Sequence, residues 1–432
     1  MVSKPRISLA ACLLPVALSA AGTVRAADEA PATRASCAST ILAGDDEEGD
    51  ADFGAAVAVS GQTALVGIPG FSTAFVTPPV NPPYVSGRVA VFTCEASTQT
   101  WTRTATIQLP ATETNQYITL GVSTALQDDL AAIGATDGLY VYRRQGQNWN
   151  QILQISPTNT NGTLPYEKWG SVIALDDHVL AIQVTEVTSN SAPGNLYVDL
   201  YQIVTHGDHA AAIRIARLKP PAGDTGRFGA SLALKEDTLV VGDPPDTTVY
   251  VYKRHGFTFK LDQKLTGTEA TPNTGFGSAV AIAKDVILIG AGGEDLVINP
   301  GFGIASSGAV YAFRHTSGPH SPWVETQHFS PATTNYSDFG GSLTVNDKGQ
   351  AAIGTPSAYD FEEQTSYGPT FFYTLQEGQF VLSSASPQYP GLAPATYLGI
   401  TDEYLITGSV ANAGAGGSVS GASITNLTSE PQ

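Results

Sequence analysis

The chain has 432 residues, and 21 Lys and Arg against 39 Asp and Glu give a formal net charge of −18. This acidic balance argues against nucleic acid or an anionic membrane as a partner. The 44 glycines and 27 prolines fall short of the share that marks a low-complexity chain, and 42 % hydrophobic residues predict a folded protein with a large core.

The N-terminal residues have the pattern of an export signal. Lys4 and Arg6 precede an apolar run over 7–22, and Val24-Arg25-Ala26 fits the small-x-small cleavage pattern. We therefore expect residues 1–26 to be removed and the mature protein to be secreted or periplasmic. No later segment would insert it into a membrane.

The three cysteines are Cys12, Cys37 and Cys94. Cys12 stands in a stretch that resembles a lipoprotein cleavage box, but it begins the apolar run instead of following it, so an outer-membrane lipoprotein is not favoured. Cys37 and Cys94 remain in the mature chain, and two cysteines in an oxidising compartment predict one disulfide. No histidines at ligand spacing accompany them, which argues against a zinc site.

A sequence repeat predicts the architecture. A large apolar residue followed by Gly recurs seven times, at spacings of 48 to 67 residues: Phe53-Gly54, Leu120-Gly121, Trp169-Gly170, Phe228-Gly229, Phe276-Gly277, Phe339-Gly340 and Leu398-Gly399. A short run of alternating pattern, as in Val57-Ala58-Val59, follows each of the first six glycines and indicates a strand. Repeats therefore start near 52, 119, 168, 227, 275, 338 and 397.

Each repeat predicts four strands. A polar turn leads to a second apolar strand, which in five repeats ends in Gly67, Gly134, Gly242, Gly290 or Gly354, with Gln183 as the exception. A third strand such as Val249-Tyr250-Val251-Tyr252 follows, and a fourth often opens with an aromatic residue: Trp101, Trp149, Phe257 or Trp323. No stretch shows convincing helical periodicity. Seven four-stranded antiparallel meanders predict an all-β fold, a seven-bladed β-propeller.

The repeat resembles the FG-GAP repeat. Phe-Gly opens the first strand, and Gly-Ile-Pro (67–69), Gly-Asp-Pro (242–244) and Gly-Thr-Pro (354–356) follow the second. The resemblance covers about 38–427 and implies a propeller like that of integrin α subunits and many exported bacterial proteins. Integrin-type repeats often carry an Asp-rich calcium loop after the first strand; here that connection is a turn of two to four residues. The resemblance therefore implies neither calcium sites nor any other cofactor.

The order of the strands also predicts how the ring closes. The seventh repeat ends without a fourth strand, while Ser39-Thr40-Ile41-Leu42-Ala43 resembles the fourth strands of other repeats. We expect this N-terminal strand to complete the last blade, because an open ring would leave an apolar edge unpaired. Cys37 and Cys94 would then meet at the seam. This divides the mature chain into a lead at 27–37, the propeller at 38–427 and a tail at 428–432.

Two clusters of potential metal ligands have simpler interpretations. Asp45, Asp46, Glu48 and Asp50 belong to the densest acidic run, which we interpret as a solvated loop, with a weak calcium site as the alternative. His206-Gly207-Asp208-His209 falls where other repeats have a hairpin, so we interpret it as a turn.

Two functions remain open. The favoured one is a non-catalytic, monomeric binding or adhesion module for a protein or carbohydrate. The sequence contains no Gly-x-Ser-x-Gly elbow, and neither mature cysteine has a His neighbour. The alternative is a polysaccharide-active enzyme, a lyase or hydrolase, whose acidic residues meet at the mouth of the channel.

Loop lengths suggest where a ligand binds. Loops between second and third strands are long at 70–86, 185–194, 292–307 and 357–367, whereas turns between first and second strands are uniformly short. We call the two ends of the propeller the long-loop face and the short-turn face. Aromatic residues that could contact a ligand lie in these long loops: Phe71, Tyr84, Phe302, Tyr359, Phe361 and Tyr367.

Overall fold

The structure is a computed structural model in which the chain divides at Ala35, and Ser36–Gln432 form one compact unit. The residues that it describes all belong to this unit. They are 36–42, 52–70, 87–110, 118–157, 166–188, 194–206, 209–221, 227–272, 274–293, 295–296, 305–318, 321–331, 338–356, 359–360, 365–366, 369–385, 396–409 and 421–428.

Blades 1 to 4 occupy the first half of the ring. Blade 1 consists of β2 (Ala56–Ser60), β3 (Thr63–Ile68), β4 (Arg88–Glu95) and β5 (Thr100–Gln108). Blade 2 consists of β6 (Ser123–Gln127), β7 (Leu130–Ala135), β8 (Gly138–Gln145) and β9 (Asn148–Ile155). Blade 3 consists of β11 (Ile173–Asp176), β12 (Val179–Val187), β13 (Asn195–His206) and β14 (His209–Leu218). Blade 4 consists of β15 (Ser231–Lys235), β16 (Thr238–Asp243), β17 (Thr248–His255) and β18 (Thr258–Leu265).

Blades 5 to 7 complete the ring. Blade 5 consists of β19 (Phe276–Ala283), β20 (Val286–Ala291), β23 (Ala309–His315) and β24 (Trp323–Phe329). Blade 6 consists of β25 (Ser342–Val345), β26 (Gln350–Gly354), β29 (Phe371–Gln376) and β30 (Gln379–Ala385). Blade 7 consists of β31 (Tyr397–Ile400), β32 (Tyr404–Ser409), β33 (Gly421–Asn426) and β1 (Thr40–Leu42).

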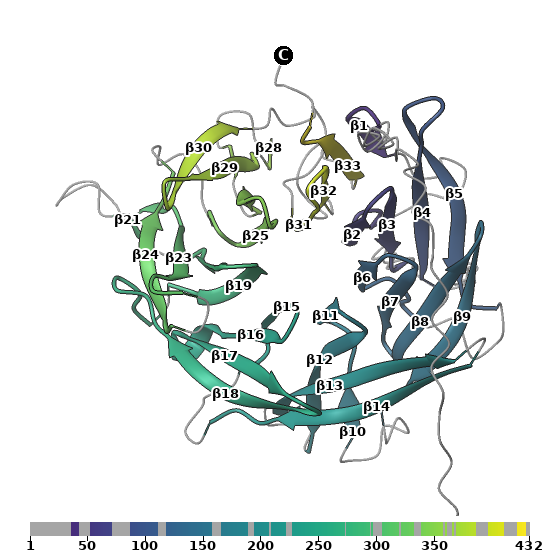
Figure 1. The fold of residues 1–432 in the computed structure, drawn as a ribbon, viewed down its shortest axis with the longest axis horizontal. Helices are drawn as coiled ribbons and strands as arrows, with labels where there is room; N and C mark the ends of the chain where they lie inside the picture. Colours follow the sequence, from purple (N-terminus) through teal and green to yellow (C-terminus); the bar gives the residue numbers. More distant parts are fainter. Residues whose placement is uncertain are drawn as a thin grey trace, which may run out of the picture. The chain divides into compact units, whose positions relative to one another are not determined.

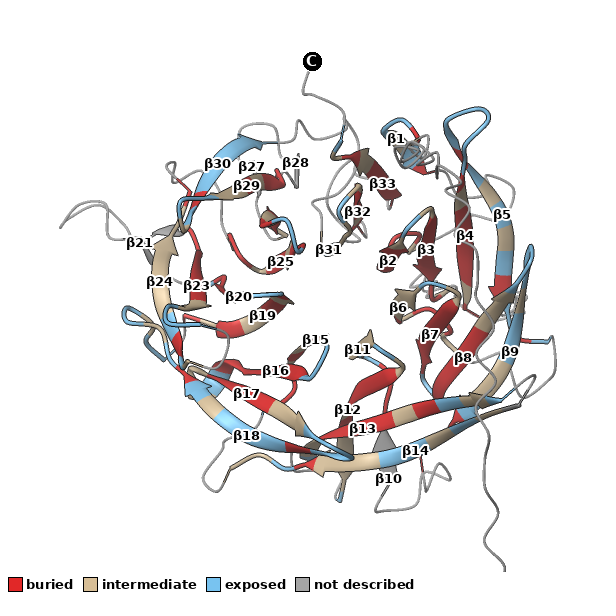
Figure 2. Cartoon of the chain, viewed as in Figure 1, coloured by how far each residue is buried: buried red, intermediate tan, exposed pale blue. Residues whose placement is uncertain are grey.

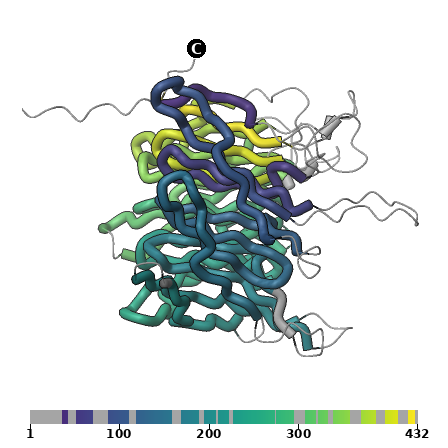
Figure 3. Tube along the Cα trace, turned by 90° about the vertical axis from the view of Figure 1, so that its right-hand side faces the viewer, coloured from purple at the N-terminus to yellow at the C-terminus, as the bar shows by residue number. Residues whose placement is uncertain are grey.

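The seven blades form a ring, so the protein is an all-β seven-bladed propeller (Figure 1). The first strand of each blade lies next to the central channel and the fourth lies outermost. Figure 3 shows the same ring from the side. Within the described residues, the only helical segment is a three-residue 3-10 turn, η1 (Pro244–Asp246).

Glycines let neighbouring blades approach closely. Gly121 has φ +99°, a left-handed conformation that few other residues adopt, and its N–H donates to the carbonyl of Gly134 at 2.9 Å. A Cβ on Gly67 of blade 1 would overlap the carbonyl oxygen of Gly121 of blade 2. The Gly of Phe-Gly and the Gly that ends the second strand are therefore two halves of one contact between blades.

The hydrophobic core lies between the blades. The six buried clusters each combine side chains of two neighbouring blades, such as Val198 and Leu200 of blade 3 with Tyr250 and Tyr252 of blade 4. Figure 2 shows buried residues along the middle strands and exposed residues on much of the outermost ones. Because each blade is buried on both faces, its strands are apolar without strict alternation.

The N-terminal strand closes the ring as predicted. β1 pairs antiparallel with β33, with Thr40 opposite Ile424 and Leu42 opposite Ala422. The predicted disulfide is also present: Cys37 bonds Cys94 across a separation of 57 residues, with their Cα atoms 5.8 Å apart.

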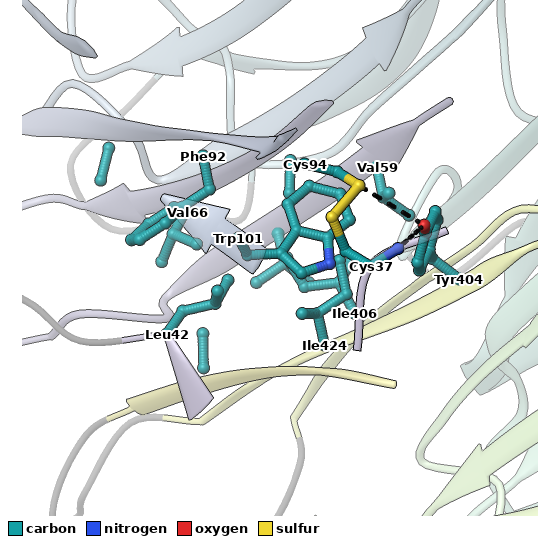
Figure 4. Packing of buried hydrophobic residues seen from close by; sticks show 14 of the residues in the cluster. Cys37, Leu42, Val59, Val66, Phe92, Cys94, Trp101, Tyr404, Ile406 and Ile424 are labelled. Carbon is teal, nitrogen blue, oxygen red and sulfur yellow. Dashed lines mark hydrogen bonds between the residues drawn. A yellow bond between two sulfur atoms is a disulfide. The ribbon is translucent and has the colours of Figure 1, made fainter. Parts of the chain in front are cut away.

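Around this disulfide, aromatic side chains from blades 1 and 7 fill the seam (Figure 4). The Cys37 N–H donates to the Tyr404 hydroxyl at 2.7 Å, and the Trp101 and Tyr404 rings meet edge to face with centroids 5.0 Å apart. Burial raises the pKa of Tyr404 above its ordinary value, so this hydroxyl stays protonated.

Three details differ from the sequence prediction. Leu398 and Gly399 lie inside β31, opposite Thr407 and Ile406, so they do not form a seventh Phe-Gly turn. Phe257 does not open a fourth strand: it lies in the hairpin before β18, and Phe259 takes the buried position opposite Arg254. The long loop expected at 185–194 is shorter, because β12 continues to Val187.

Candidate functional site

Most of the predicted ligand-binding aromatic residues lie outside the described residues. These are Phe71, Tyr84, Phe302, Phe361 and Tyr367. The backbone of Tyr359 is described: it belongs to β27 (Tyr359–Asp360), where it pairs with Ser366 of β28 (Thr365–Ser366). The acidic residues Asp45, Asp46, Glu48 and Asp50 also lie outside the described part.

The long-loop face is where the blades depart from the four-stranded plan. Blade 5 carries a small strand pair, β21 (Asp295–Leu296) with β22 (Ala305–Ser306), between its second and third strands, and blade 6 carries β27 with β28 in the same connection. In blade 3, β10 (Tyr166–Lys168) pairs with the extended end of β12. All of these additions lie at the end of the propeller where second strands finish.

A polar cluster of blade 3 extends to this same face. The buried carboxylate of Asp199 accepts two hydrogen bonds from Arg217, both of 2.7 Å, and one of 3.3 Å from Arg214. The Arg217 guanidinium lies 5.0 Å from the centre of the Tyr197 ring. Two charge-assisted contacts and a cation–π contact thus fix Arg217 in place.

Glu186 extends the cluster toward the end of the strand. Its carboxylate accepts hydrogen bonds from the Tyr197 hydroxyl at 2.9 Å and from Asn195 at 3.1 Å, and these two bonds hold its pKa below the ordinary value. The sequence analysis missed this cluster. The available signal was one acidic residue within the apolar strand Tyr197-Val198-Asp199-Leu200, with arginines in the next strand.

The opposite, short-turn face carries a set of bonds that link the first turns of neighbouring blades. Asp176 of blade 3 accepts a hydrogen bond from Gln127 of blade 2 at 3.2 Å and another from the N–H of Glu236 of blade 4. Burial raises the pKa of Asp176 above its ordinary value. This carboxyl therefore bridges three blades beside the channel.

A second bridge on the short-turn face skips a blade. Lys235 of blade 4 donates to Asp347 of blade 6 at 2.9 Å, and the same carboxylate accepts from the N–H of Lys284 of blade 5 at 3.0 Å. Burial alone would raise the pKa of Asp347, but the bonds from Lys235 and Lys284 hold it below its ordinary value. These contacts join blades 4, 5 and 6 at the mouth of the channel.

Other potential ligands do not converge in the described part. His206 and His209 pair as the last and first residues of β13 and β14, which confirms the hairpin interpretation. Among the described residues, no group of three or more His, Cys, Asp or Glu side chains is placed to hold a metal ion. No helix among them is long and apolar enough to cross a membrane.

The blade geometry and a family comparison define the class of this protein. An FG-GAP repeat family model matches residues 259–313, which run from β18 of blade 4 through β19 and β20 into β23 of blade 5. A search of curated proteins returned no match. The chain is therefore a seven-bladed β-propeller that contains an FG-GAP repeat, a fold that fits a binding module.

Proposed function

We propose that this protein is an exported binding module that recognises a protein or carbohydrate through its long-loop face. One observation carries the proposal: the additions to the regular blades, β10, β21 with β22 and β27 with β28, all lie on that face. A fold needs no such additions for its stability, and loops placed on a rigid scaffold are where binding residues concentrate. The Cys37–Cys94 disulfide is compatible with an extracellular or periplasmic location.

The short-turn face supports the same assignment by contrast. Its turns form hydrogen bonds between blades, as at Asp176 and Asp347, and these hydrogen bonds hold the ring rigid. The long-loop face can then vary without disturbing the ring. Aromatic residues such as Tyr359 would supply stacking surfaces for sugar rings or anchors for a protein.

A glycan array and a protein-display screen would test the proposal. The variant Tyr84→Ala/Phe302→Ala/Phe361→Ala should abolish binding to the hits with little change in melting temperature. The control Asp128→Asn/Glu236→Gln, on the short-turn face, should bind like the wild type. Loss of binding in the control, with retention in the triple variant, would refute the assignment.

Incubating glycan hits with the protein separates binding from catalysis. Asp176 is the observation in favour of the enzymatic alternative, because a carboxyl of raised pKa beside a channel is a candidate general acid. A binding module leaves the glycan intact. Product release that disappears in Asp176→Asn would instead establish the polysaccharide-active enzyme.

A further inference from the structure

The outer rim of the propeller has seams in which the fourth strands of neighbouring blades face each other. Between blades 3 and 4, Gln202 pairs with Ile213 in the ladder and accepts a hydrogen bond from Arg254 of blade 4 at 2.7 Å. This face of blade 3, including Ile213, is therefore turned toward blade 4.

Leu261 lies on the face of blade 4 that is turned toward blade 3. Leu261 pairs with Tyr252, whose ring packs in one cluster with Val198 and Leu200 of blade 3. Ile213 and Leu261 thus lie on opposite sides of one seam, at its solvent edge, and they are 55 % and 46 % exposed.

Two further apolar side chains lie near this edge. Val204, two residues beyond Gln202 on the same face of β13, is 45 % exposed, and Phe257 in the β17–β18 hairpin is 79 % exposed. We name Val204, Ile213, Phe257 and Leu261 the rim patch. Exposed apolar residues that gather in one place mark interaction sites more often than scattered ones do.

The fold does not require apolar residues at these positions. The ladder positions equivalent to Ile213 and Leu261 hold Thr102 and Gln151 between blades 1 and 2, and Lys260 and Glu325 between blades 4 and 5. Between blades 5 and 6 they hold Val324 and Leu382. The fold thus accepts polar and charged pairs at this position, so the apolar pair is a property of particular seams.

Two basic side chains, Arg254 and Lys264, lie at the seam between blades 3 and 4. Arg254 borders the rim patch and donates to two neutral groups, the Gln202 side chain and the Gly256 carbonyl. Lys264, on the same face of β18 as Leu261, lies 5.2 Å from the centre of the Tyr250 ring.

We propose that the rim patch docks an extended segment of another protein in which acidic side chains flank apolar ones. Its apolar residues would cover Ile213, Leu261 and Phe257, and its carboxylates would pair with Arg254 and Lys264. β14 and β18 are the last strands of their sheets, so a segment lying along them can add main-chain hydrogen bonds. This site is separate from the long-loop face.

Selection from a displayed library of random 12-residue peptides tests the proposal. Wild-type protein should enrich peptides that combine Asp or Glu with Leu, Ile, Val or Phe. The variant Ile213→Thr/Leu261→Gln, which copies the seam between blades 1 and 2, should raise the Kd of the selected peptides at least tenfold. Lys264→Ala should raise the Kd and flatten its dependence on salt, because a screened charge pair is lost.

Matched controls separate this site from other surfaces. Val324→Thr/Leu382→Gln makes the same change between blades 5 and 6 and should leave the Kd within twofold, as should the triple aromatic variant of the long-loop face. The melting temperature of every variant should stay within a few degrees of the wild type.

Three results would overturn the proposal. The first is a selection that yields no consensus of acidic and apolar residues. The second is an Ile213→Thr/Leu261→Gln variant that binds the selected peptides with the Kd of the wild type, and the third is a Val324→Thr/Leu382→Gln control whose Kd rises as much as that of the Ile213→Thr/Leu261→Gln variant. Patch-dependent binding only to anionic lipid vesicles or to a sulfated glycan would also overturn it, in favour of that ligand.

Discussion

At the scale of single residues, the contact between blades depends on the absence of side chains. Gly67 shows this best, because a Cβ there would overlap the Gly121 carbonyl oxygen and would lie 3.1 Å from the Ala56 Cβ. The overlap is with backbone, which cannot move without shifting the whole neighbouring blade. The Phe-Gly and second-strand glycines therefore serve packing as well as turn geometry.

Gly67→Ala should lower the free energy of unfolding by about 2–3 kcal/mol, the upper part of the range for overpacking, because the overlap is with backbone. Gly61→Ala is the matched control: its φ is +53°, but nothing lies within 4 Å, so only backbone strain of about 1 kcal/mol is expected. Urea denaturation of both variants measures the difference. Equal losses would show that strain, not the contact between blades, limits position 67.

Asp199 is the buried charge whose loss should matter most. Asp199→Asn removes the buried carboxylate to which Arg217 and Arg214 donate, so we expect a loss of about 1–3 kcal/mol, because both arginines keep part of their exposure to water. In the control Asp285→Asn, the lost partner of Arg314 is half exposed, and the loss should stay below about 1 kcal/mol. Similar losses by chemical denaturation would mean that Asp199 contributes no more than a surface pair.

At the scale of elements, the turns of the short-turn face should give the ring a dependence on pH. The pKa of Asp347 is lowered in the folded state, so its contribution is present above the ordinary value of 3.8 and is lost as pH falls through the lower folded value. Asp176 has a raised pKa and acts in the opposite sense, since its protonation favours the folded state.

Asp347→Asn should therefore destabilise the protein at pH 6 by less than about 1 kcal/mol, because both partners are partly exposed. The difference from wild type should shrink as pH falls from 5 to 3. Thermal unfolding across this range measures it. In a Lys235→Met background, Asp347→Asn should destabilise the protein less than it does in the wild type. A destabilisation by Asp347→Asn that stays the same from pH 5 to pH 3 would contradict the role of this charge.

The strands were predictable because each blade repeats one pattern of local sequence. The third strands at Val89, Leu139, Val249 and Val310 all lie where the sequence predicted them. Blade 3 was less predictable because its second strand lacks the closing Gly and has Gln183 instead, which hydrogen-bonds with Ser171 and Thr185. The sequence prediction took Leu398-Gly399 as the seventh copy of the apolar-Gly pair, but such a pair can also occur within a strand, as it does in β31.

The candidate sites were less accessible to sequence reasoning. The Asp199 cluster joins β13 to β14, and the rim patch joins β14 to β18, so both depend on ladder register and on the β-bulges that shift it. One such bulge, between Val251 and Tyr252, changes which residues of β18 face blade 3. Sequence alternation alone cannot place a bulge, and it assigned Phe257 the position that Phe259 holds.

At the scale of the whole molecule, one disulfide and one short strand close the ring. Cys37→Ser/Cys94→Ser should lower the free energy of unfolding by roughly 4 kcal/mol, because the 57-residue loop is no longer closed in the unfolded chain. Denaturation of the variant and of reduced wild type should give the same loss. Two reactive thiols in unfolded, unreduced wild-type protein would contradict the bond itself.

The pairing of β1 with β33 also orders events during synthesis. Ser39 bonds the N–H of Asn426, 387 residues later, so the first strand of the propeller meets its partner only when translation is nearly finished. At about 5–20 residues per second, this leaves β1 without its blade for roughly 20–80 s on the ribosome. The other six blades can assemble in that interval, and the closing of the ring becomes the last step by which the chain is fixed in its folded form.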